Sequence, residues 1–493
     1  VGLVNKSGEF KGIVKKRYEP PYFTDHKGEA EQDPDYYYAC IVDVIKRLKK
    51  ESGAFFPNII GMTLDTVRDT SVILDENFKP LHRTILWLDQ RLASGSLAHR
   101  PKLHSLIFNL VGMMPTMRLN ARKSICLWYQ ENLPDIWKKT RHYGNISSYL
   151  TYKMTGEWKD SPASIIGHYP LDFKKGKYLT SHRALKNLYD IPISYLPELV
   201  PQGEILGHIS DEFKNATGLP SNLPLYSCGS DKACESLGVG ALDSRIAALS
   251  YGTASTVEVT TKKYYESQPF LPSYPFCIYG YHNMDIQIYR GYWMINWFLQ
   301  YFCHFDISNN EEFVKIIKEF NKKMLTIPPG SNGLILQPYW QPGLARPLAK
   351  GAVIGFTDTH TSAHFYRAII EGVGYALREG MEYFQHKNGH RVEEIMISGG
   401  GSQSDEICQV TSDLFGLPVS RVQTFETSLL GAGIAGFLAA KEFASPEEAI
   451  KAMVHKSKTF TPNMEDHKAY NKIFYRGYKK MYSKLSRIYK DIR

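Results

Sequence analysis

One segment decides how this chain folds: Cys228-Gly-Ser-Asp231-Lys-Ala-Cys-Glu-Ser-Leu-Gly-Val-Gly240, which directly follows the apolar residues 225–227. Those apolar residues predict a short strand, and a helix is predicted to begin at Asp231. A carboxylate at the C-terminal end of a strand, beside Gly and Ser, points without obstruction into a cleft. Asp231 is therefore a candidate general base or metal ligand. The alternative is that Asp231 only caps the helix that follows, a frequent position for Asp.

Outward from this segment, the two halves of the chain follow the same plan. Each begins with a strand, a tight turn and a strand, over residues 1–18 and residues 247–261. Strands then alternate with helices, and the helix with the longest pattern runs from Thr361 to about Gln385. Hairpin sheets followed by alternating strands and helices predict an α/β architecture that is present twice.

Length and composition agree with this duplication. The 493 residues exceed one ordinary domain, and 43% hydrophobic with 22% charged residues excludes a disordered chain. We predict an N-terminal domain over 1–240 and a C-terminal domain over 241–493. No run of about 18 apolar residues occurs, so the sequence predicts no membrane-spanning helix.

The net charge of +9 is concentrated at one end of the chain. Residues 471–493 hold eight Lys or Arg and one Asp, a net charge of +7 that leaves +2 for the other 470 residues. Four apolar residues recur with helical spacing there: Met481, Leu485, Ile488 and Ile492. We interpret the segment as an amphipathic helix docked on the body with a solvated basic face. The charge then indicates no nucleic acid and no membrane as partner.

The cysteines and histidines suggest no metal site. None of the seven Cys forms a CxxC pair, which argues against a zinc ribbon and a disulfide scaffold and fits a reducing, cytoplasmic location. His360 and His364 are four residues apart, but no third ligand accompanies them, so they are interpreted as residues of a first helical turn.

Two glycine-containing turns are candidates for phosphate and nucleotide binding. The turn at Gly252-Thr253 offers backbone N–H groups and a hydroxyl, although an ordinary hairpin would look the same. The second turn, Ser398-Gly-Gly400-Gly401-Ser402-Gln-Ser-Asp405, lies between a predicted strand and a predicted helix. It permits close approach of a ligand to the backbone at a helix N-terminus. It matches neither GxGxxG nor GxxxxGK[ST], which argues against dinucleotide binding and a P-loop.

A further pair of segments suits a small polyhydroxy ligand. Arg68-Asp69 and Trp87 lie in Thr66-Val-Arg-Asp-Thr70 and Leu86-Trp-Leu-Asp-Gln-Arg91, each beside an apolar strand. A carboxylate accepts hydroxyl hydrogens, a guanidinium donates, and an indole packs against C–H groups. The alternative is a buried Arg–Asp pair that is purely structural.

Taken in order, these segments resemble the FGGY family of carbohydrate kinases, which includes xylulokinase and glycerol kinase. Two later stretches add to the resemblance: Gly351-Ala-Val-Ile-Gly-Phe-Thr with His364-Phe-Tyr-Arg-Ala-Ile-Ile-Glu-Gly372, and Glu426 through Leu430-Gly-Ala-Gly-Ile-Ala. The resemblance implies two actin/hexokinase-like (ribonuclease H-like) domains with an active-site cleft between them. It also implies ATP, Mg²⁺ and phosphorylation of a hydroxyl of a small sugar or polyol.

The resemblance further assigns roles by position. Asp231 matches the catalytic base, and Arg68, Asp69, Trp87 and Asp231 match substrate-binding positions. ATP and phosphate would be bound by Gly252, Thr253, Gly400, Gly401, Ser402 and Asp405. The Asp-x-Gly-Thr loop that opens the family, with its Mg²⁺-coordinating Asp, is missing before Val1, so we expect upstream residues to be absent from the sequence given. The metal would then lie on that loop, with Asp231 nearby.

The substrate is left open by conflicting signals. Arg68-Asp69 is similar to glycerol kinase and autoinducer-2 kinases, whereas Leu86–Arg91 and Gly-Ser-Asp-Lys are similar to xylulokinase. A ketose such as xylulose is favoured, with glycerol or another polyol as the alternative. A catalytically silent sugar- or nucleotide-binding regulator is the non-enzymatic alternative. A homodimer is compatible with the sequence.

Overall fold

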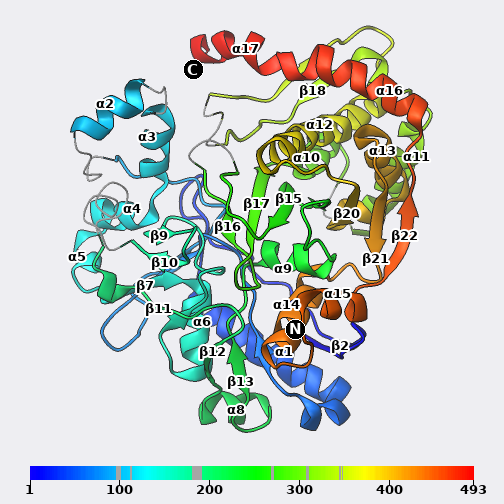
Figure 1. Cartoon of the computed structure of the whole chain (residues 1–493). Helices are drawn as coiled ribbons and strands as arrows, with labels where there is room; N and C mark the ends of the chain where they lie inside the picture. Colours follow the sequence, from blue (N-terminus) through cyan, green and yellow to red (C-terminus); the bar gives the residue numbers. More distant parts are fainter. Residues whose placement is uncertain are drawn as a thin grey trace. The chain divides into compact units, whose positions relative to one another are not determined.

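A computed structural model of the chain describes residues 1–95, 102–110, 114–179, 191–267, 271–306, 310–343, 346 and 348–492. The chain divides into two compact units (Figure 1). The first unit comprises residues 1–238, 274–282 and 426–454, and the second comprises 239–273, 283–425 and 455–493. The sequence predicts a boundary between residues 240 and 241. The units change near the same place, but two later segments return to the first unit.

The first unit is built on short strands and the helices packed against them. β4 (Met62–Thr63) pairs in parallel with β13 (Pro224–Tyr226), and β13 pairs with β12 (Ile205–His208) in antiparallel. A four-stranded sheet has the order β3 (Glu31–Gln32), β6 (Thr84–Ile85), β5 (Ser71–Leu74), β7 (His142–Asn145). β1 (Gly2–Val4) and β2 (Phe10–Ile13) form the predicted opening hairpin.

Helices cover these strands. The principal ones are α1 (Pro34–Ser52), α3 (Met114–Lys123), α4 (Ile125–Asn132), α6 (Ile146–Thr155), α8 (Asp211–Thr217), α9 (Asp231–Gly238), α14 (Thr427–Ala439) and α15 (Pro446–Met453). Asp33 caps α1, accepting a hydrogen bond from the N–H of Asp35 at 2.9 Å, and Pro34 occupies the first turn. Shorter elements complete the unit: α2 (Lys102–Leu110), α5 (Pro134–Trp137), β8 (Lys159–Asp160), β9 (Leu171–Asp172), β10 (Lys177–Tyr178), β11 (Glu198–Leu199) and β16 (Tyr274–Pro275).

The second unit is built on a mixed sheet. Its strands have the order β17 (His282–Ile288), β15 (Ser255–Thr261), β14 (Ile246–Tyr251), β20 (Glu394–Ser398), β21 (Val419–Val422), β22 (Lys456–Phe460). The parallel pairs β14–β20 and β20–β21 form its centre. The helices are α10 (Trp293–Tyr301), α11 (Asn310–Met324), α12 (Ser362–Asn388), α13 (Asp405–Phe415), α16 (Met464–Ile473) and α17 (Lys479–Asp491), and β18 (Ile335–Gln337) pairs with β19 (Ala352–Ile354).

The long helix α12 organises the core of the second unit. Seventeen of its residues are buried, among them the charged side chains of Arg367, Glu371 and Arg378. Glu371 accepts hydrogen bonds from the Arg367 guanidinium at 2.7 Å and from the Tyr470 hydroxyl at 2.9 Å. A buried charge is tolerated only when it is paired and hydrogen-bonded in this way.

Some of the elements expected from the sequence differ from the structure. The apolar residues 59–62 predict a short buried strand from Asn58, but the strand begins only at Met62, because residues 53–58 form a 3₁₀ helix. At the C-terminus, Met481 is buried as expected, but Ile488 and Ile492 are 52% and 59% exposed. Tyr489 is buried in their place, since its hydroxyl donates to Gln337 Oε1 at 2.6 Å and turns that side of α17 inward.

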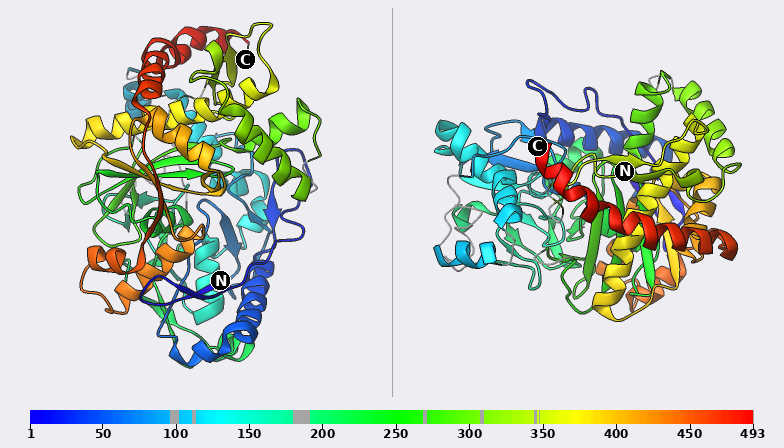
Figure 2. Two further views of the ribbon diagram at one scale, coloured as in Figure 1. Left: turned by 90° about the vertical axis from the view of Figure 1, so that its right-hand side faces the viewer. Right: turned by 90° about the horizontal axis from the view of Figure 1, so that it is seen from above.

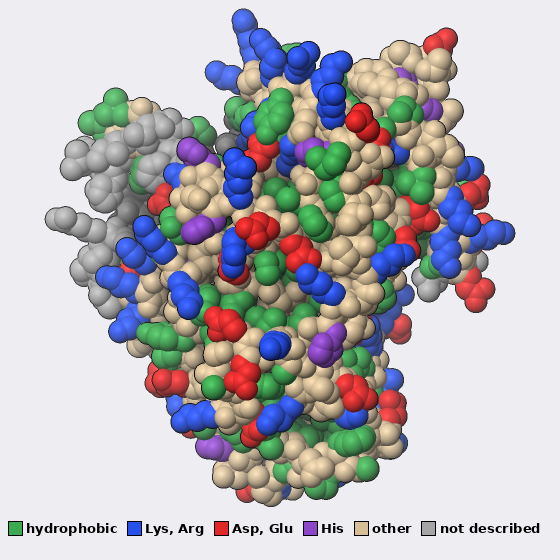
Figure 3. All heavy atoms as spheres, turned by 45° about the vertical axis from the view of Figure 1, so that its right-hand side comes forward, with side chains coloured by type: hydrophobic (Ala, Val, Ile, Leu, Met, Phe, Trp, Pro, Cys, Tyr) green, Lys and Arg blue, Asp and Glu red, His purple; other side chains and the backbone are tan. Residues whose placement is uncertain are grey.

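The C-terminal helices are continuous through a π-helical turn at Phe474–Tyr478 (Figure 2). Figure 3 shows Lys and Arg side chains gathered at the top of that view, where α16 and α17 lie in Figure 1. Within the described ranges, no helix combines the length and the hydropathy that crossing a lipid bilayer requires.

Candidate active-site residues in the two units

In the first unit, the loop that carries Asp231 is tied to the loop that carries Arg68 and Asp69. Thr66 and Ser230 form a parallel bridge, and the N–H of Asp231 donates to the carbonyl of Thr66 at 3.0 Å. Arg68 Nε donates to Ser230 Oγ at 3.0 Å, and the guanidinium lies 4.9 Å from the centre of the Tyr274 ring. The structure thus brings together residues that are about 160 positions apart in the chain.

Asp231 occupies the first turn of α9 and is only partly exposed. Its Oδ1 accepts the N–H of Lys232 at 2.9 Å. Burial raises the pKa of Asp231 above its ordinary value, although the positive charges of Lys232 and Arg68 act in the opposite direction. A carboxylate is a stronger base when its pKa is raised, so this environment suits proton abstraction better than a fully solvated one.

A second carboxylate, Asp65, lies in the loop that carries Arg68 and Asp69, and the sequence did not predict a role for it. Burial, followed by the negative charge of Asp231, raises the pKa of Asp65 to about 6. Two carboxylates that repel one another share a site, an arrangement typical of positions that bind a cation or a proton. No sequence motif distinguished Asp65, because its proximity to Asp231 depends on the pairing of the two loops.

Asp69 is held by His168, which also was not predicted. Asp69 Oδ2 is 2.8 Å from His168 Nδ1, and Oδ1 accepts the N–H of His168 at 3.1 Å. Burial alone would raise the pKa of Asp69, but the charge and hydrogen bonds of His168 outweigh it and the pKa falls below its ordinary value. Asp69 is therefore an ionised hydrogen-bond acceptor.

The backbone around Asp69 is specialised for this contact. Asp69 has a φ of 50°, an uncommon conformation for a residue with a side chain. A Cβ at Gly167 would lie 2.3 Å from Asp69 Oδ1, so only glycine lets the carboxylate approach here.

Trp87 is not joined to these residues. Its side chain is 39% exposed, and none of the contacts in the described ranges links it to Arg68, Asp69 or Asp231. The neighbouring Asp89 and Arg91 form an ion pair at 2.9 Å, and Arg91 also pairs with Glu31 at 2.8 Å. The charged part of that motif is structural here, and the substrate role of Trp87 stays a prediction.

In the second unit, Gly252 and Thr253 lie in the tight turn between β14 and β15. The turn is backed by the start of α10, because the N–H groups of Tyr292 and Trp293 donate to the carbonyls of Gly252 and Thr253 at 3.0 and 3.4 Å. Thr253 is exposed at the tip. The turn therefore leaves the hydroxyl of Thr253 accessible to a ligand.

The glycine-rich turn between β20 and α13 is closely packed on its inner side. Gly399 has a φ of 80°, and a Cβ at Gly401 would lie 2.8 Å from Tyr251 Cβ and from Tyr292 Cε1. The rings of Tyr251 and Tyr292 are stacked at 4.6 Å. Ser402 is buried, and its hydroxyl donates to the carbonyl of Gly399 at 2.7 Å, so this side chain maintains the turn.

Asp405 is engaged by two cations. Its carboxylate pairs with Arg421 and with Lys458, and the hydrogen bond from Lys458 is the main reason that the pKa of Asp405 is lowered. Arg421 Nη1 also donates to the carbonyls of Ser402 and Gln403 at 3.0 and 3.3 Å. Asp405 therefore anchors Arg421, which in turn fixes the glycine-rich turn.

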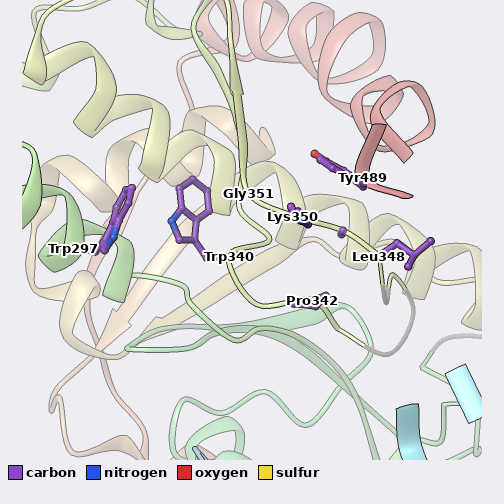
Figure 4. Close-up of a pocket in the computed structure, with 8 residues that line it drawn as sticks. Trp297, Trp340, Pro342, Leu348, Lys350, Gly351 and Tyr489 are labelled. Carbon is purple, nitrogen blue, oxygen red and sulfur yellow. The ribbon is translucent and has the colours of Figure 1, made fainter. Parts of the chain in front are cut away.

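A cavity of about 590 Å³ lies elsewhere in the second unit (Figure 4). None of the predicted ATP-binding residues lines it. Its wall contains Trp297, Trp340, Pro342, Leu348, Ala349, Lys350, Gly351 and Tyr489. The two indole rings meet edge to face at 5.3 Å, and Lys350 Nζ donates to the carbonyl of Ile492 at 3.1 Å.

The residues present fit ATP and Mg²⁺. In the part of the chain that the structure describes, no three His, Cys, Asp or Glu side chains form a metal cage. Mg²⁺ in kinase sites is bound by one or two carboxylates plus phosphate oxygens and water, and Asp65 and Asp231 provide such a pair. The glycine-rich turn lies before the N-terminus of α13, and a Cβ at Gly400 would meet no protein atom closer than 4.0 Å, so a nucleotide phosphate or sugar can approach the backbone there.

His360 and His364 accept backbone hydrogen bonds at the start of α12. The N–H of Thr361 donates to His364 Nδ1 at 3.2 Å in a capping box, and the N–H of Thr357 donates to His360 Nδ1 at 2.9 Å. They are residues of the helix start, as expected from their position.

Family models match both halves of the chain. Residues 1–238 match the N-terminal domain of the FGGY family of carbohydrate kinases, and residues 247–440 match its C-terminal domain. Together the matched ranges cover most of the chain.

The relatives that match this chain are named after different substrates. A xylulose kinase of Lactococcus lactis is 26% identical over 482 residues, which cover 97% of this chain and 93% of the relative. Glycerol kinase 1 of Saccharolobus solfataricus is 24% identical, covering 94% and 90%. The crystal structure of a gluconate kinase from Lactobacillus acidophilus superposes with a TM-score of 0.82 at 20% identity, covering 100% and 96%.

Proposed function

This chain belongs to the FGGY family of carbohydrate kinases, and from that premise we propose that its acceptor substrate is a ketose such as xylulose. The membership makes the protein a phosphotransferase that acts on a sugar or polyol. The ketose is supported by the xylulokinase-like segment Leu86–Arg91 and by the similarity to a xylulose kinase along nearly the whole chain. Glycerol or another polyol is the second candidate, favoured by Arg68-Asp69 and by the similarity to a glycerol kinase.

Asp231 is proposed as the catalytic base. The assignment rests on its partly buried carboxylate and on its main-chain N–H, which donates to the carbonyl of Thr66 and so joins Asp231 to the loop of Arg68. Asp231 would accept the proton of the substrate hydroxyl as the oxygen attacks in line. Arg68 and Asp69 would hold neighbouring hydroxyls, so that the reacting hydroxyl is presented to Asp231.

ATP, with Mg²⁺, would supply the phosphoryl group and neutralise its charge. Thr253, Gly400 and Gly401 would bind the nucleotide through backbone N–H groups and the Thr253 hydroxyl, and Gly252 would shape its turn, because its own N–H donates to the carbonyl of Ala254 at 3.1 Å. Ser402 and Asp405 would support the glycine-rich turn. Asp65 and Asp231 would be the carboxylates nearest the metal. A cytoplasmic location is proposed on the absence of paired-cysteine motifs in the sequence.

The assignment is tested by ADP release from purified protein with D-xylulose, glycerol and D-gluconate in parallel. We expect D-xylulose to give the highest kcat/KM. Asp231→Ala should lower kcat by at least a thousandfold while ATP affinity stays within threefold, because the base acts only in transfer. Asp211→Ala is the control, since that carboxylate is 88% exposed and its ion pair in the described ranges is with Lys214 on the same helix. Near-wild-type turnover in Asp231→Ala would contradict the base assignment, and a higher kcat/KM with glycerol would favour the second candidate.

A further inference from the structure

We propose that His168 is a positioning residue for substrate recognition: it orients the Asp69 carboxylate so that both oxygens can accept hydrogens from two adjacent hydroxyl groups. The inference rests on the proposed function and adds a substrate feature to it, a vicinal diol. It concerns a residue that no motif indicated, 99 positions from Asp69 in the chain.

The contacts of Asp69 leave the right number of acceptor positions. An ionised carboxylate has about four lone-pair positions on its two oxygens. His168 uses one on each oxygen, through its main-chain N–H at 3.1 Å and its Nδ1 at 2.8 Å. One position per oxygen remains, and the Asp69 side chain is still 30% exposed. A carboxylate with one open position on each oxygen matches a pair of neighbouring hydroxyl donors.

The geometry fixes which His168 nitrogen carries a proton. Because the ionised carboxylate can only accept, His168 Nδ1 must donate and is therefore protonated. His168 Nε2 lies 3.1 Å from Asn120 Oδ1. Because that oxygen only accepts, the contact is a hydrogen bond either when Nε2 is protonated as well or when the amide is turned so that its NH₂ donates, and in both cases α3 holds the far side of the ring. The ring is clamped between Asp69 and α3, with only 13% of its side chain exposed.

The backbone at Asp69 and Gly167 is adapted to the contact between Asp69 and His168. Asp69 has the uncommon φ of 50°, its N–H donates to the carbonyl of Ile166 at 2.9 Å, and Gly167 leaves space for its carboxylate. Backbone in a rare conformation persists only where its surroundings enforce it, and such positions concentrate at ligand-binding sites. The arrangement favours a role in binding over a simple stabilising ion pair.

The kinetic test is a double-mutant cycle on the full chain, measured with whichever of D-xylulose, glycerol and D-gluconate the wild type phosphorylates best. His168→Ala should raise the KM for that substrate at least tenfold, with kcat and the KM for ATP within threefold. His168→Asn, whose amide can donate from a position near Nδ1, should stay within threefold of wild type. In the Asp69→Asn background, His168→Ala should change the KM by less than twofold. His208→Ala, at an exposed position in the same unit, is the control.

Two kinetic results would overturn the inference. One is a KM within twofold of wild type for His168→Ala. The other is an equal increase in both backgrounds, because a structural role independent of Asp69 would produce that.

A second measurement does not depend on activity. In ¹⁵N-histidine spectra of the wild type, the His168 resonance is identified as the one that disappears in His168→Asn. This resonance should show a protonated Nδ1, and Asp69→Asn should change its chemical shift. An unprotonated Nδ1 would refute the pairing whatever the kinetics show. If the wild type phosphorylates none of the three compounds, the proposed function fails, and this spectrum still decides whether His168 orients Asp69.

Discussion

The main-chain N–H of Asp231 donates to the carbonyl oxygen of Thr66 at 3.0 Å, which makes the beginning of α9 a direct neighbour of the Arg68–Asp69 loop. The hydrogen bond involves the backbone, so it is kept when the Asp231 side chain is changed. Substitutions at Asp231 can therefore separate chemistry from the architecture of the loop. Changes that displace α9 as a whole should disturb both.

Gly431 tests the dependence of Asp231 on the packing of α9. A Cβ at Gly431 would lie 1.8 Å from the carbonyl oxygen of Cys234, and one at Gly238 would lie 1.8 Å from that of Thr427, so α9 and α14 touch backbone to backbone. Gly431→Ala should push the helices apart, cost about 1–3 kcal/mol of stability and lower kcat at least tenfold. Thermal unfolding and ADP release measure the two effects. Gly53→Ala, with nothing within 4 Å, should leave both unchanged, and a fully active Gly431→Ala would refute the coupling.

Gly401 and Gly400 differ in how closely the protein packs against them in the glycine-rich turn. Gly401→Ala would place a methyl group 2.8 Å from the Tyr251 and Tyr292 side chains, whereas the nearest atom to a Cβ at Gly400 is 4.0 Å away. We expect Gly401→Ala to raise the KM for ATP at least tenfold, because the turn must shift to relieve the overlap. The sugar KM should change less. Steady-state kinetics with ATP varied provide the test. An unchanged KM for ATP in Gly401→Ala would show that close packing of the turn is irrelevant to nucleotide binding.

Glu371 should be essential to the stability of the second unit. Its carboxylate is 2% exposed and accepts from Arg367, Tyr470, the Ser331 hydroxyl and the N–H of Gly330. Glu371→Ala leaves the Arg367 guanidinium buried without its counter-ion, which should cost about 3–5 kcal/mol. The comparison is Glu319→Ala, which removes an exposed pair with Lys323 and should cost about 0.2–0.5 kcal/mol. Denaturant unfolding gives both values, and similar losses would contradict the buried-network argument.

Asp160 should make stability depend on pH. It is 1% exposed, accepts from Ser147, Ser148 and the N–H of Ser161, and burial raises its pKa to about 6. The folded state therefore binds this proton more tightly than the unfolded state, whose pKa is near 3.9. The contribution is fully present below pH 4 and is lost as the pH rises through about 6, a change on the order of 3 kcal/mol.

The measurement for Asp160 is the melting temperature of wild type and Asp160→Asn at pH 4.5 and pH 7. The wild-type value minus the variant value should fall between the two pH values, because the amide cannot ionise. A difference that stays constant would show that Asp160 does not titrate in this range.

The sequence alone determined the fold class and most of the elements. Strands such as Glu394–Ser398 and the helix from Thr361 depend on local patterns of apolar residues, caps and glycines, which act over a few residues. The same locality made the ordered motifs around Asp231, Gly252 and Gly400 recognisable. The local pattern failed where a tertiary contact competed with it. The hydrogen bond from the Tyr489 hydroxyl to Gln337 buries Tyr489 and leaves Ile488 and Ile492 exposed.

Only the tertiary structure decided which side chains work together. His168 reaches Asp69 across 99 residues, and Asp65 influences Asp231 because the Thr66–Ser230 bridge aligns their loops. Arg421 reaches the glycine-rich turn because β21 lies beside β20. Such contacts depend on strand pairing and helix packing between distant segments, and a single sequence contains no local signal for them. The sequence indicated the proposed catalytic base, and the packing of the chain supplied the residues that hold its neighbours in place.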